Sequence, residues 1–308
     1  MTAGWAASVT RGRSLLDRTV GLDGARFIAA APSWAEARSA LAATPYGRDL
    51  AADAGRAEAR RVAAASTVWH FRVLAGWLPP GGAGLARLAV APVEISNIEG
   101  HLARLSGSDG EQAVPLGSLA VAWPRVSAAA NEADVRSVLS RSAWGDPGGT
   151  DAVSIAAGLR IAWARRVRGA AELARPWAMG GLALVVARER WAFDRDINDA
   201  AAHELDRLLS RHWRAATSVP DLADRLPRSA SWVLADVDTP DELWRCELAL
   251  LRRVVADSSP VAAAGRYSAA TVVAIAALLL VDLTRVTAAI EVAASEPSRI
   301  EVFDAVAA

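Results

Sequence analysis

The sequence predicts an all-α protein made of three related helical units that fold as one compact domain. Apolar residues recur at helical spacing in nearly every segment, whereas the alternation of apolar and polar residues that is typical of strands is rare. One pattern of helix cap, leucine and aromatic residue occurs three times, and Gly and Pro clusters separate the helical segments. With 308 residues, 53% of them hydrophobic, the chain is long enough to bury a large core.

The first expected element is an amphipathic helix near the N-terminus. Its apolar face is formed by Trp5, Val9, Leu16 and Val20. Arg11 and Arg18 point the other way. Because arginines interrupt this segment repeatedly, it lacks the long apolar core that a signal peptide needs.

Each copy of the repeated pattern begins with a helix N-cap. The cap residue is followed three positions later by an acid: Ser33 by Glu36, Asn131 by Asp134, and Ser218 by Asp221. A side-chain oxygen at the cap accepts from a free backbone N–H, and an acid in the first turn suits the helix dipole. We therefore expect three short capped helices, offset by 98 residues (131 − 33) and 87 residues (218 − 131).

A leucine, an aromatic residue and a pair of arginines follow each cap. The leucines are Leu41, Leu139 and Leu226, and the aromatic residues are Tyr46, Trp144 and Trp232. The arginine pairs are Arg60–Arg61, Arg165–Arg166 and Arg252–Arg253. Each unit is thus expected to contain a short capped helix, an aromatic turn, a helix with paired arginines, a Gly/Pro loop and a longer helix. The predicted repeats cover residues 1–110, 111–208 and 209–308.

Two features of this pattern leave alternatives open. Twelve tryptophans against two tyrosines is unusual, and turn tryptophans such as Trp34 either pack one repeat against another or contact a partner. The arginine pairs either belong to solvated helix faces or form a basic ring around a threefold axis. Repeats of nearly 100 residues are longer than those of common solenoids, which favours closure around such an axis.

Turn residues mark the remaining boundaries. Gly and Pro clusters at 77–84, 106–118 and 144–150 are expected to be loops. Thr239 and Glu242 form a capping box with Pro240 at the first helical position, which predicts a helix start in the third repeat.

The most apolar stretch of the chain covers residues 269–281, between Arg266 and Asp282. Its thirteen residues are fewer than the ~20 that a helix needs to span a bilayer. This stretch therefore predicts a buried helix with no transmembrane segment.

The charge balance bears on the choice of partner. The 34 basic residues, all of them Arg, equal the 34 acidic residues in number. A neutral chain lacks the broad basic surface that attracts nucleic acid or anionic lipid, so we expect neither as a partner. A single cysteine, Cys246, excludes an internal disulfide and is expected to be a small core thiol.

No motif for catalysis, cofactor binding or metal binding emerges. His70, His101, His203 and His212 include no pair at the spacing that puts two imidazoles on one helix face. The segment from Asp194 resembles the start of a calcium loop, but Asp199 replaces the turn glycine and Leu205 replaces the bidentate glutamate. Dinucleotide, P-loop and nucleophile-elbow fingerprints are also missing. We expect a protein that is not an enzyme and uses no cofactor, metal or small-molecule substrate.

Four segments carry a resemblance to a known family. They are "ASVTRGRSLLDR" at 7–18, the turn with Leu41, Thr44, Pro45, Tyr46 and Gly47, "EISNIEGHLARL" at 94–105, and "VVAIAALLLVDLTRV" at 272–286. Together with the threefold repetition, they resemble the C subunit of bacterial and archaeal A/V-type rotary ATPases, known as the d subunit in the eukaryotic V-ATPase. The last segment departs from the family pattern at Ala276, Ala277 and Thr284, and no basic residue precedes Asp282.

The resemblance implies a funnel of three helical repeats that acts as a socket in the central stalk of a rotary motor. Its partners would be the rotor shaft subunits on one face and the membrane proteolipid ring on the other. The socket would transmit torque for proton or other ion transport without hydrolysing anything. It would be a peripheral protein on the cytoplasmic face of the cell membrane, and the resemblance is not specific enough to assign residues to either contact.

Two other functions are compatible with the sequence. A helical-repeat scaffold unrelated to rotary ATPases would bind a protein partner in a concave face. A helical enzyme would need a cluster of carboxylates with perturbed pKa values in a cavity.

Overall fold

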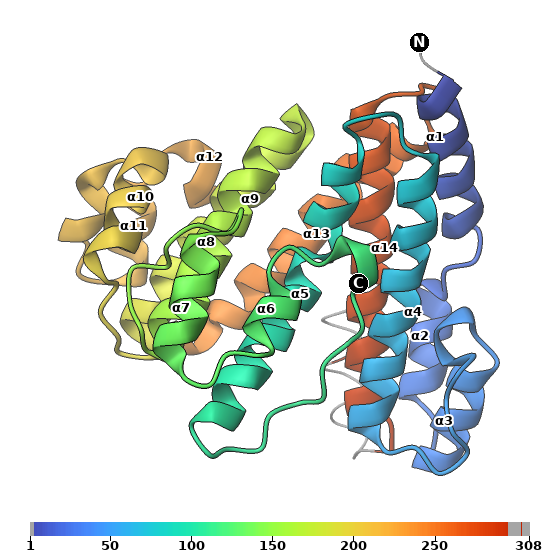
Figure 1. Ribbon diagram of the computed structural model, residues 1–308. Helices are drawn as coiled ribbons and strands as arrows, with labels where there is room; N and C mark the ends of the chain where they lie inside the picture. Colours follow the sequence, from blue (N-terminus) through green and yellow to red (C-terminus); the bar gives the residue numbers. More distant parts are fainter. Residues whose placement is uncertain (1–2, 295–302, 304–308) are drawn as a thin grey trace. The chain divides into compact units, whose positions relative to one another are not determined.

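The computed structural model describes residues 3–294 and Phe303, and these residues contain helices and turns but no strand (Figure 1). The predicted all-α class is confirmed. The chain divides into two compact units that share two helices, α5 (Ala83–Leu105) and α13 (Leu243–Ala263). Unit 1 comprises Met1–Val93, Glu111–Leu119 and Val255–Ala308, and unit 2 comprises Glu94–Gly110 and Ala120–Val254. The division into repeats 1–110, 111–208 and 209–308 stays a prediction.

Unit 1 is built around the helix α14 (Ala269–Val292), which packs against α1, α2 and α4 (Figure 1). Its other elements are α1 (Ala3–Leu16), α2 (Gly21–Ala29), α3 (Trp34–Ala42), the 3-10 turns η1 (Pro45–Gly47) and η2 (Gly117–Leu119), and α4 (Arg56–Trp77). Ile28, Leu41, Val286, Ile290 and Phe303 are among the residues that form its buried core.

The predicted apolar face of the first helix needs a correction. The helix ends at Leu16, so Val20 lies outside it, and the buried positions are Ser8, Val9, Gly12 and Leu15. Thr19 donates its hydroxyl to the Leu16 carbonyl oxygen at 2.7 Å, which satisfies that carbonyl at the helix end. A Cβ atom at Gly12 would lie 3.0 Å from the Cγ2 atom of Ile275, so this glycine lets α1 approach α14 closely.

The helix α14 is longer than the predicted apolar stretch, because it continues through Asp282 to Val292. By length and composition it is the one helix among residues 3–294 that could cross a membrane. In the structure it has the packing of a core helix, with Val272, Ile275, Leu279 and Val286 almost completely buried.

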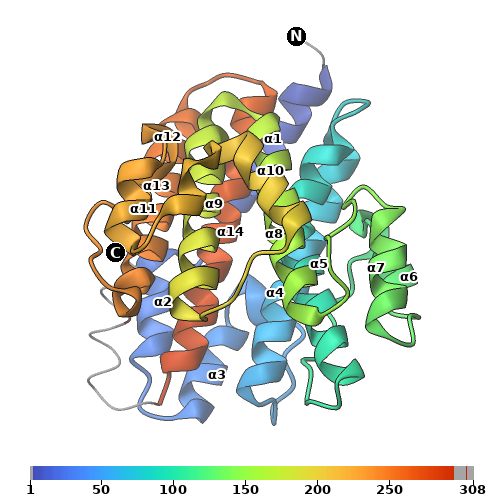
Figure 2. The ribbon, with the colours of Figure 1, turned by 90° about the vertical axis from the view of Figure 1, so that its left-hand side faces the viewer.

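Unit 2 contains α6 (Trp123–Val126), α7 (Glu132–Ser140), α8 (Ala152–Ala170), α9 (Arg175–Ala187), α10 (Asp199–Leu209), α11 (Val219–Arg225) and α12 (Arg228–Ser231). Short turns connect them: η3 (Glu172–Ala174), the π-turn η4 (Arg188–Ala192), and the 3-10 turns η5 (Arg211–Ala215), η6 (Trp232–Leu234) and η7 (Pro240–Glu242). The helices α8 and α9 lie side by side in both views (Figures 1 and 2). Leu182, Val186 and Leu205 belong to the buried core of this unit.

The three predicted helix caps are confirmed. Ser33 and Ser218 each accept from the backbone N–H three residues later at 3.2 Å, and Asn131 does so at 2.9 Å. The capping box of Thr239 and Glu242 is also present, and it opens η7 ahead of α13. The Gly/Pro segments at 77–84, 106–118 and 144–150 lie mainly in turns and irregular backbone between the helices.

Candidate functional site

The aromatic residues of the three predicted turns contact residues of their own unit. In unit 1 the hydroxyl of Tyr46 donates to Asp282 Oδ2 at 2.6 Å. In unit 2 the guanidinium carbon of Arg166 lies 5.4 Å from the ring centre of Trp144, and that of Arg253 lies 5.5 Å from the ring centre of Trp232. Two of the predicted aromatic turns are therefore held by a cation–π contact with the second arginine of a predicted pair.

Three other arginines from the predicted Arg–Arg pairs form ion pairs with acidic residues of unit 1 or unit 2, in each case within their own unit. Arg60 pairs with Glu111 and Glu291, and Arg61 pairs with Glu58 at 2.6 Å. Arg165 pairs with Glu204 at 3.4 Å. These ion pairs and ring contacts place five of the six arginines against groups of their own unit and give no support to a free basic ring.

The first of two unpredicted polar contacts joins α5 to α6. The Glu94 carboxylate, 1% exposed, accepts from the backbone N–H groups of Val121, Ala122 and Trp123 at 2.7 to 3.1 Å. These are N–H groups at the start of α6, whose own cap residue, Ala122, has no side-chain acceptor. We call this arrangement, a buried carboxylate that caps another helix, the Glu94 junction.

The Asp282 junction repeats this arrangement in unit 1. Asp282 on α14 is 3% exposed and accepts from the backbone N–H groups of Val20 at 3.0 Å and Gly21 at 2.8 Å, at the start of α2. The Tyr46 hydroxyl is its third donor. Burial raises the pKa of Tyr46 far above its ordinary value, and the neighbouring Asp282 carboxylate raises it further. Tyr46 therefore stays protonated and acts as a donor.

A third carboxylate stands at a comparable place in the sequence. Glu189 follows Glu94 by 95 residues (189 − 94) and precedes Asp282 by 93 (282 − 189), and it too lies at the end of a long apolar stretch. Glu189 as a whole residue is 8% exposed. Unlike the other two, its side chain forms no hydrogen bond or ion pair with any residue in the described part of the chain, and its carboxylate oxygens reach solvent.

The backbone around Glu189 explains this difference. Residues Arg188–Ala192 form the π-turn η4, which adds one residue to the helical turn and so rotates the side chains that follow. The neighbouring Arg190 reaches the short helix η5, donating to the carbonyl oxygens of Trp213 at 3.3 Å and Arg214 at 3.4 Å. The contact with η5 is therefore made by an arginine that binds carbonyl oxygens, whereas in the two junctions a carboxylate binds backbone N–H groups at a helix start.

Two ion pairs surround Glu189. Arg160 pairs with Glu99 at 2.6 Å, and Arg188 pairs with Glu247. Burial raises the pKa of Glu189, and Arg195, Arg160 and Arg188 partly oppose that rise. Burial likewise raises the pKa values of Glu99 and Glu247, against the effect of their arginine partners.

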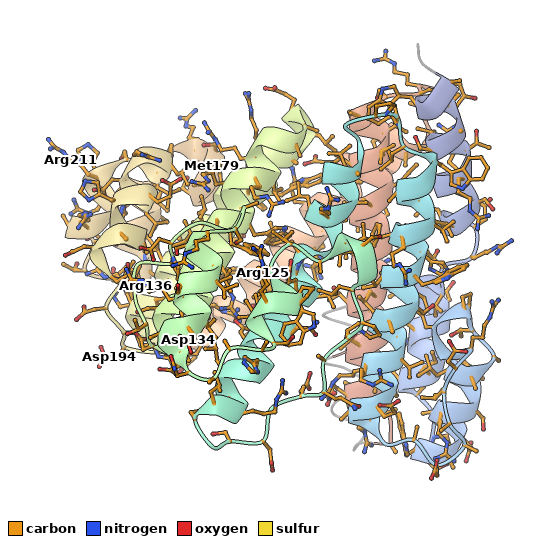
Figure 3. The ribbon with its side chains drawn as sticks, viewed as in Figure 1. Arg125, Asp134, Arg136, Met179, Asp194 and Arg211 are labelled. Carbon is orange, nitrogen blue, oxygen red and sulfur yellow. The ribbon has the colours of Figure 1, made fainter. Side chains whose placement is uncertain are left out.

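Exposed aromatic side chains lie next to the π-turn η4 and the turn η7 along the chain. The π-turn contacts η7, and the chain next to each turn carries a large exposed side chain: Phe193 is 49% exposed and Trp244 is 44% exposed. Arg195 lies 4.7 Å from the ring centre of Phe193, measured from its guanidinium carbon. Figure 3 places Asp194, the next residue after Phe193, at the edge of unit 2. We call Glu189, Phe193 and Trp244 the π-turn site.

The residues that the sequence analysis tested for chemistry lie apart from this site. His101 contacts the Ala129 carbonyl oxygen at 3.1 Å, and burial lowers the pKa of His70. Asn198 caps α10 within the segment that resembles a calcium loop. Cys246 is completely buried, as predicted, and burial raises its pKa to about 11. No group of three or more His, Cys, Asp or Glu residues within the described ranges could hold a metal ion.

Sequence reasoning missed the two junctions and the π-turn site. The available signal was a single carboxylate in or at the end of each long apolar stretch, recurring after 95 and 93 residues.

No protein-family model matches this chain, and no curated protein is significantly similar to it.

Proposed function

We propose that this chain is the non-catalytic central-stalk component of a bacterial A/V-type rotary ATPase, the counterpart of its C subunit. In this role three helical repeats form a funnel-like socket that links the rotor shaft to the membrane proteolipid ring and transmits torque during ion transport. The protein would sit on the cytoplasmic face of the membrane as a peripheral part of the complex.

The observation that carries the proposal is that the same kind of contact, a buried carboxylate capping a helix start, occurs both between neighbouring elements and between the two ends of the chain. Glu94 caps α6, which comes later in the chain, whereas Asp282 on the last long helix caps α2, near the beginning. The same contact therefore joins consecutive elements in one place and the two ends of the chain in another. This is the contact pattern expected of repeats that close on themselves, and closure is what the resemblance to the rotary-ATPase family implies.

A second line of support is mechanical. A torque-transmitting part must be stiff, and stiffness comes from close packing and from buried hydrogen bonds with few alternatives. Both junctions place a nearly completely buried carboxylate against backbone N–H groups. Each contact fixes the start of one helix against the middle of another.

The test is an affinity purification of the tagged full-length chain from membranes of its native host in mild detergent, followed by mass spectrometry. We expect rotor shaft subunits and a small proteolipid to co-purify. A parallel strain without the shaft subunits should lose the proteolipid together with the shaft. Recovery of neither, with the chain entirely in the soluble fraction, would contradict the proposal and favour a helical-repeat scaffold for another protein partner.

A further inference from the structure

We infer that α1, η1 and α4 of unit 1 form a binding site for a phosphate group, and that Arg11, Arg18, Arg48 and His70 supply its positive charge. We call these four residues the Arg11 cluster. The inference does not rest on the proposed function and goes beyond it, because the socket role requires no phosphate ligand.

The first argument is the arrangement of α1 and α4, which contact each other and run in opposite directions (Figure 1). A Cβ atom at Gly4, near the start of α1, would lie 3.0 Å from the Cα atom of Pro79, just beyond the end of α4. Arg11 lies seven residues (11 − 4) beyond that contact on α1, and His70 lies nine residues (79 − 70) before it on α4. Since each residue of a helix adds the same rise, the two side chains come from about the same level of the helix pair.

The turn η1 brings a further arginine to this level. The hydroxyl of Ser66 on α4 donates to the Pro45 carbonyl oxygen at 2.9 Å, which holds η1 against α4 about one helical turn before His70. Arg48 is the first residue after η1. Three segments that are distant in the sequence therefore supply cationic side chains to one part of unit 1.

The electrostatic effect on His70 agrees with this arrangement. Burial lowers the pKa of His70, and the positive charges of Arg11, Arg18 and Arg48 lower it further. No carboxylate in the described part of the chain opposes this effect on His70. The cluster is thus a local excess of positive charge.

The second argument is that the arginines of the cluster have no internal partners. Among the described residues, none of the three forms a hydrogen bond or an ion pair, and the acids next to them in sequence, Asp17 and Asp49, form no ion pair with them. The Nε atom of Arg11 is closed off from solvent and has no acceptor there. A buried guanidinium N–H group without an acceptor costs free energy, and such groups are nearly always paired in folded proteins. An anion from outside the chain would supply the missing acceptor.

The chemistry of the cluster favours a phosphate group. Guanidinium groups present planar sets of N–H donors that match the oxygens of a phosphate, and a protonated imidazole adds another donor. Three full positive charges close together are balanced better by a doubly charged phosphate than by a single carboxylate. The whole chain is neutral, with 34 basic and 34 acidic residues. That neutrality argues against a broad basic surface, but it is compatible with one local site for a phosphate.

The experiment titrates the purified full-length chain with inorganic phosphate at low ionic strength and measures the heat of binding. Arg11→Gln and Arg48→Gln each remove one charge of the cluster. Arg211→Gln is the matched control, because Arg211 is an exposed arginine of unit 2 (Figure 3) that has no hydrogen bond or ion pair with the described residues. We expect one phosphate per chain and a Kd that rises about tenfold in each cluster variant, which matches the loss of about one hydrogen bond to a charged group.

Circular dichroism establishes that each variant is folded. If Arg11→Gln unfolds because its side chain is partly buried, the exposed Arg48 still carries the test. The pKa of His70, followed by NMR and assigned with His70→Gln, should rise at saturating phosphate, because the bound dianion opposes the charges of the arginines. A purely structural role of the arginines would leave this pKa unchanged on addition of phosphate.

A sedimentation assay with vesicles distinguishes two sources of the phosphate. A lipid headgroup as the source predicts that the chain sediments with phosphatidylglycerol vesicles but not with phosphatidylcholine vesicles, and that Arg48→Gln sediments less. A soluble phosphate compound as the source predicts binding of inorganic phosphate with no sedimentation. Binding of neither probe by the folded wild-type chain, or an equal loss in Arg211→Gln, would overturn the site and would leave the socket proposal untouched.

Discussion

The Glu94 junction and the π-turn site place similar carboxylates in opposite situations. Glu94 accepts from three backbone N–H groups, whereas the Glu189 side chain forms no hydrogen bond in the described part of unit 2 and its carboxylate oxygens reach solvent. In the first case the carboxylate caps a helix and ties two elements together. In the second the helix carrying the acid widens into a π-turn, and an arginine makes the contact with the neighbouring short helix. A carboxylate at a recurring position in the sequence therefore caps a helix in one place and faces solvent in another.

The largest expected effect tests the Glu94 junction. Glu94→Ala leaves the N–H groups of Val121, Ala122 and Trp123 without their acceptor in a buried site, and we expect it to lower the free energy of unfolding by about 3 kcal/mol. Urea denaturation followed by circular dichroism measures this, with Glu172→Ala as the exposed control. A loss as small as that of the control would mean that the junction does not stabilise the fold.

A smaller effect is expected at the Asp282 junction. Tyr46→Phe keeps the ring but removes the hydroxyl that donates to Asp282, so unfolding should become easier by about 1.5 kcal/mol. Tyr267→Phe is the matched control, because the Tyr267 hydroxyl forms no hydrogen bond with residues 3–294. Equal stability of the two variants in thermal unfolding would show that the third donor of Asp282 is dispensable.

The π-turn site should respond in the opposite direction. Burial of the residue raises the pKa of the Glu189 carboxyl, so Glu189→Met removes a charge that the folded state disfavours, and we expect the isolated chain to gain about 1 kcal/mol of stability. The same substitution at Glu94 should destabilise the chain, since that carboxylate has its donors. Destabilisation by both substitutions, measured by urea denaturation, would remove the distinction between the two sites.

The smallest effect is a pH dependence confined to Glu189. Burial raises the pKa of this carboxyl, so from the ordinary glutamate value of about 4.3 up to the raised pKa the folded chain binds more protons than the unfolded chain. Its contribution to stability therefore falls as pH rises through that window. Glu189→Gln does not titrate, so its stability relative to wild type should grow over the same window and then level off.

A curve for Glu189→Gln parallel to that of wild type across this window would contradict the raised pKa. Urea unfolding of both proteins at several pH values gives the comparison. Glu242→Gln is a useful contrast, because hydrogen bonds from the backbone of Asp238 and Thr239 lower the pKa of Glu242. Stability from that carboxylate is lost as pH falls, so the stability difference should change with pH in the opposite direction.

Much of the local structure could be predicted from the sequence. The caps at Ser33, Asn131 and Ser218 depend on a side-chain oxygen and an N–H three residues away, and that chemistry is complete within one turn. The end of the first helix was predicted too late, because hydrophobic spacing alone does not register the hydrogen bond by which Thr19 ends it.

The amino-acid order alone is enough to specify the all-α class, the capped helices, the capping box at Thr239 and the burial of Cys246. The pairing of each carboxylate with a helix start depends on the packing of distant segments. Asp282 and the Val20 N–H group, for example, are 262 positions apart in the sequence, so no local pattern predicts their contact. The same packing leaves Glu189 without such a partner among the described residues. One extra residue in a helical turn changes the direction of every later side chain, and that small backbone choice depends on the packing of the whole unit.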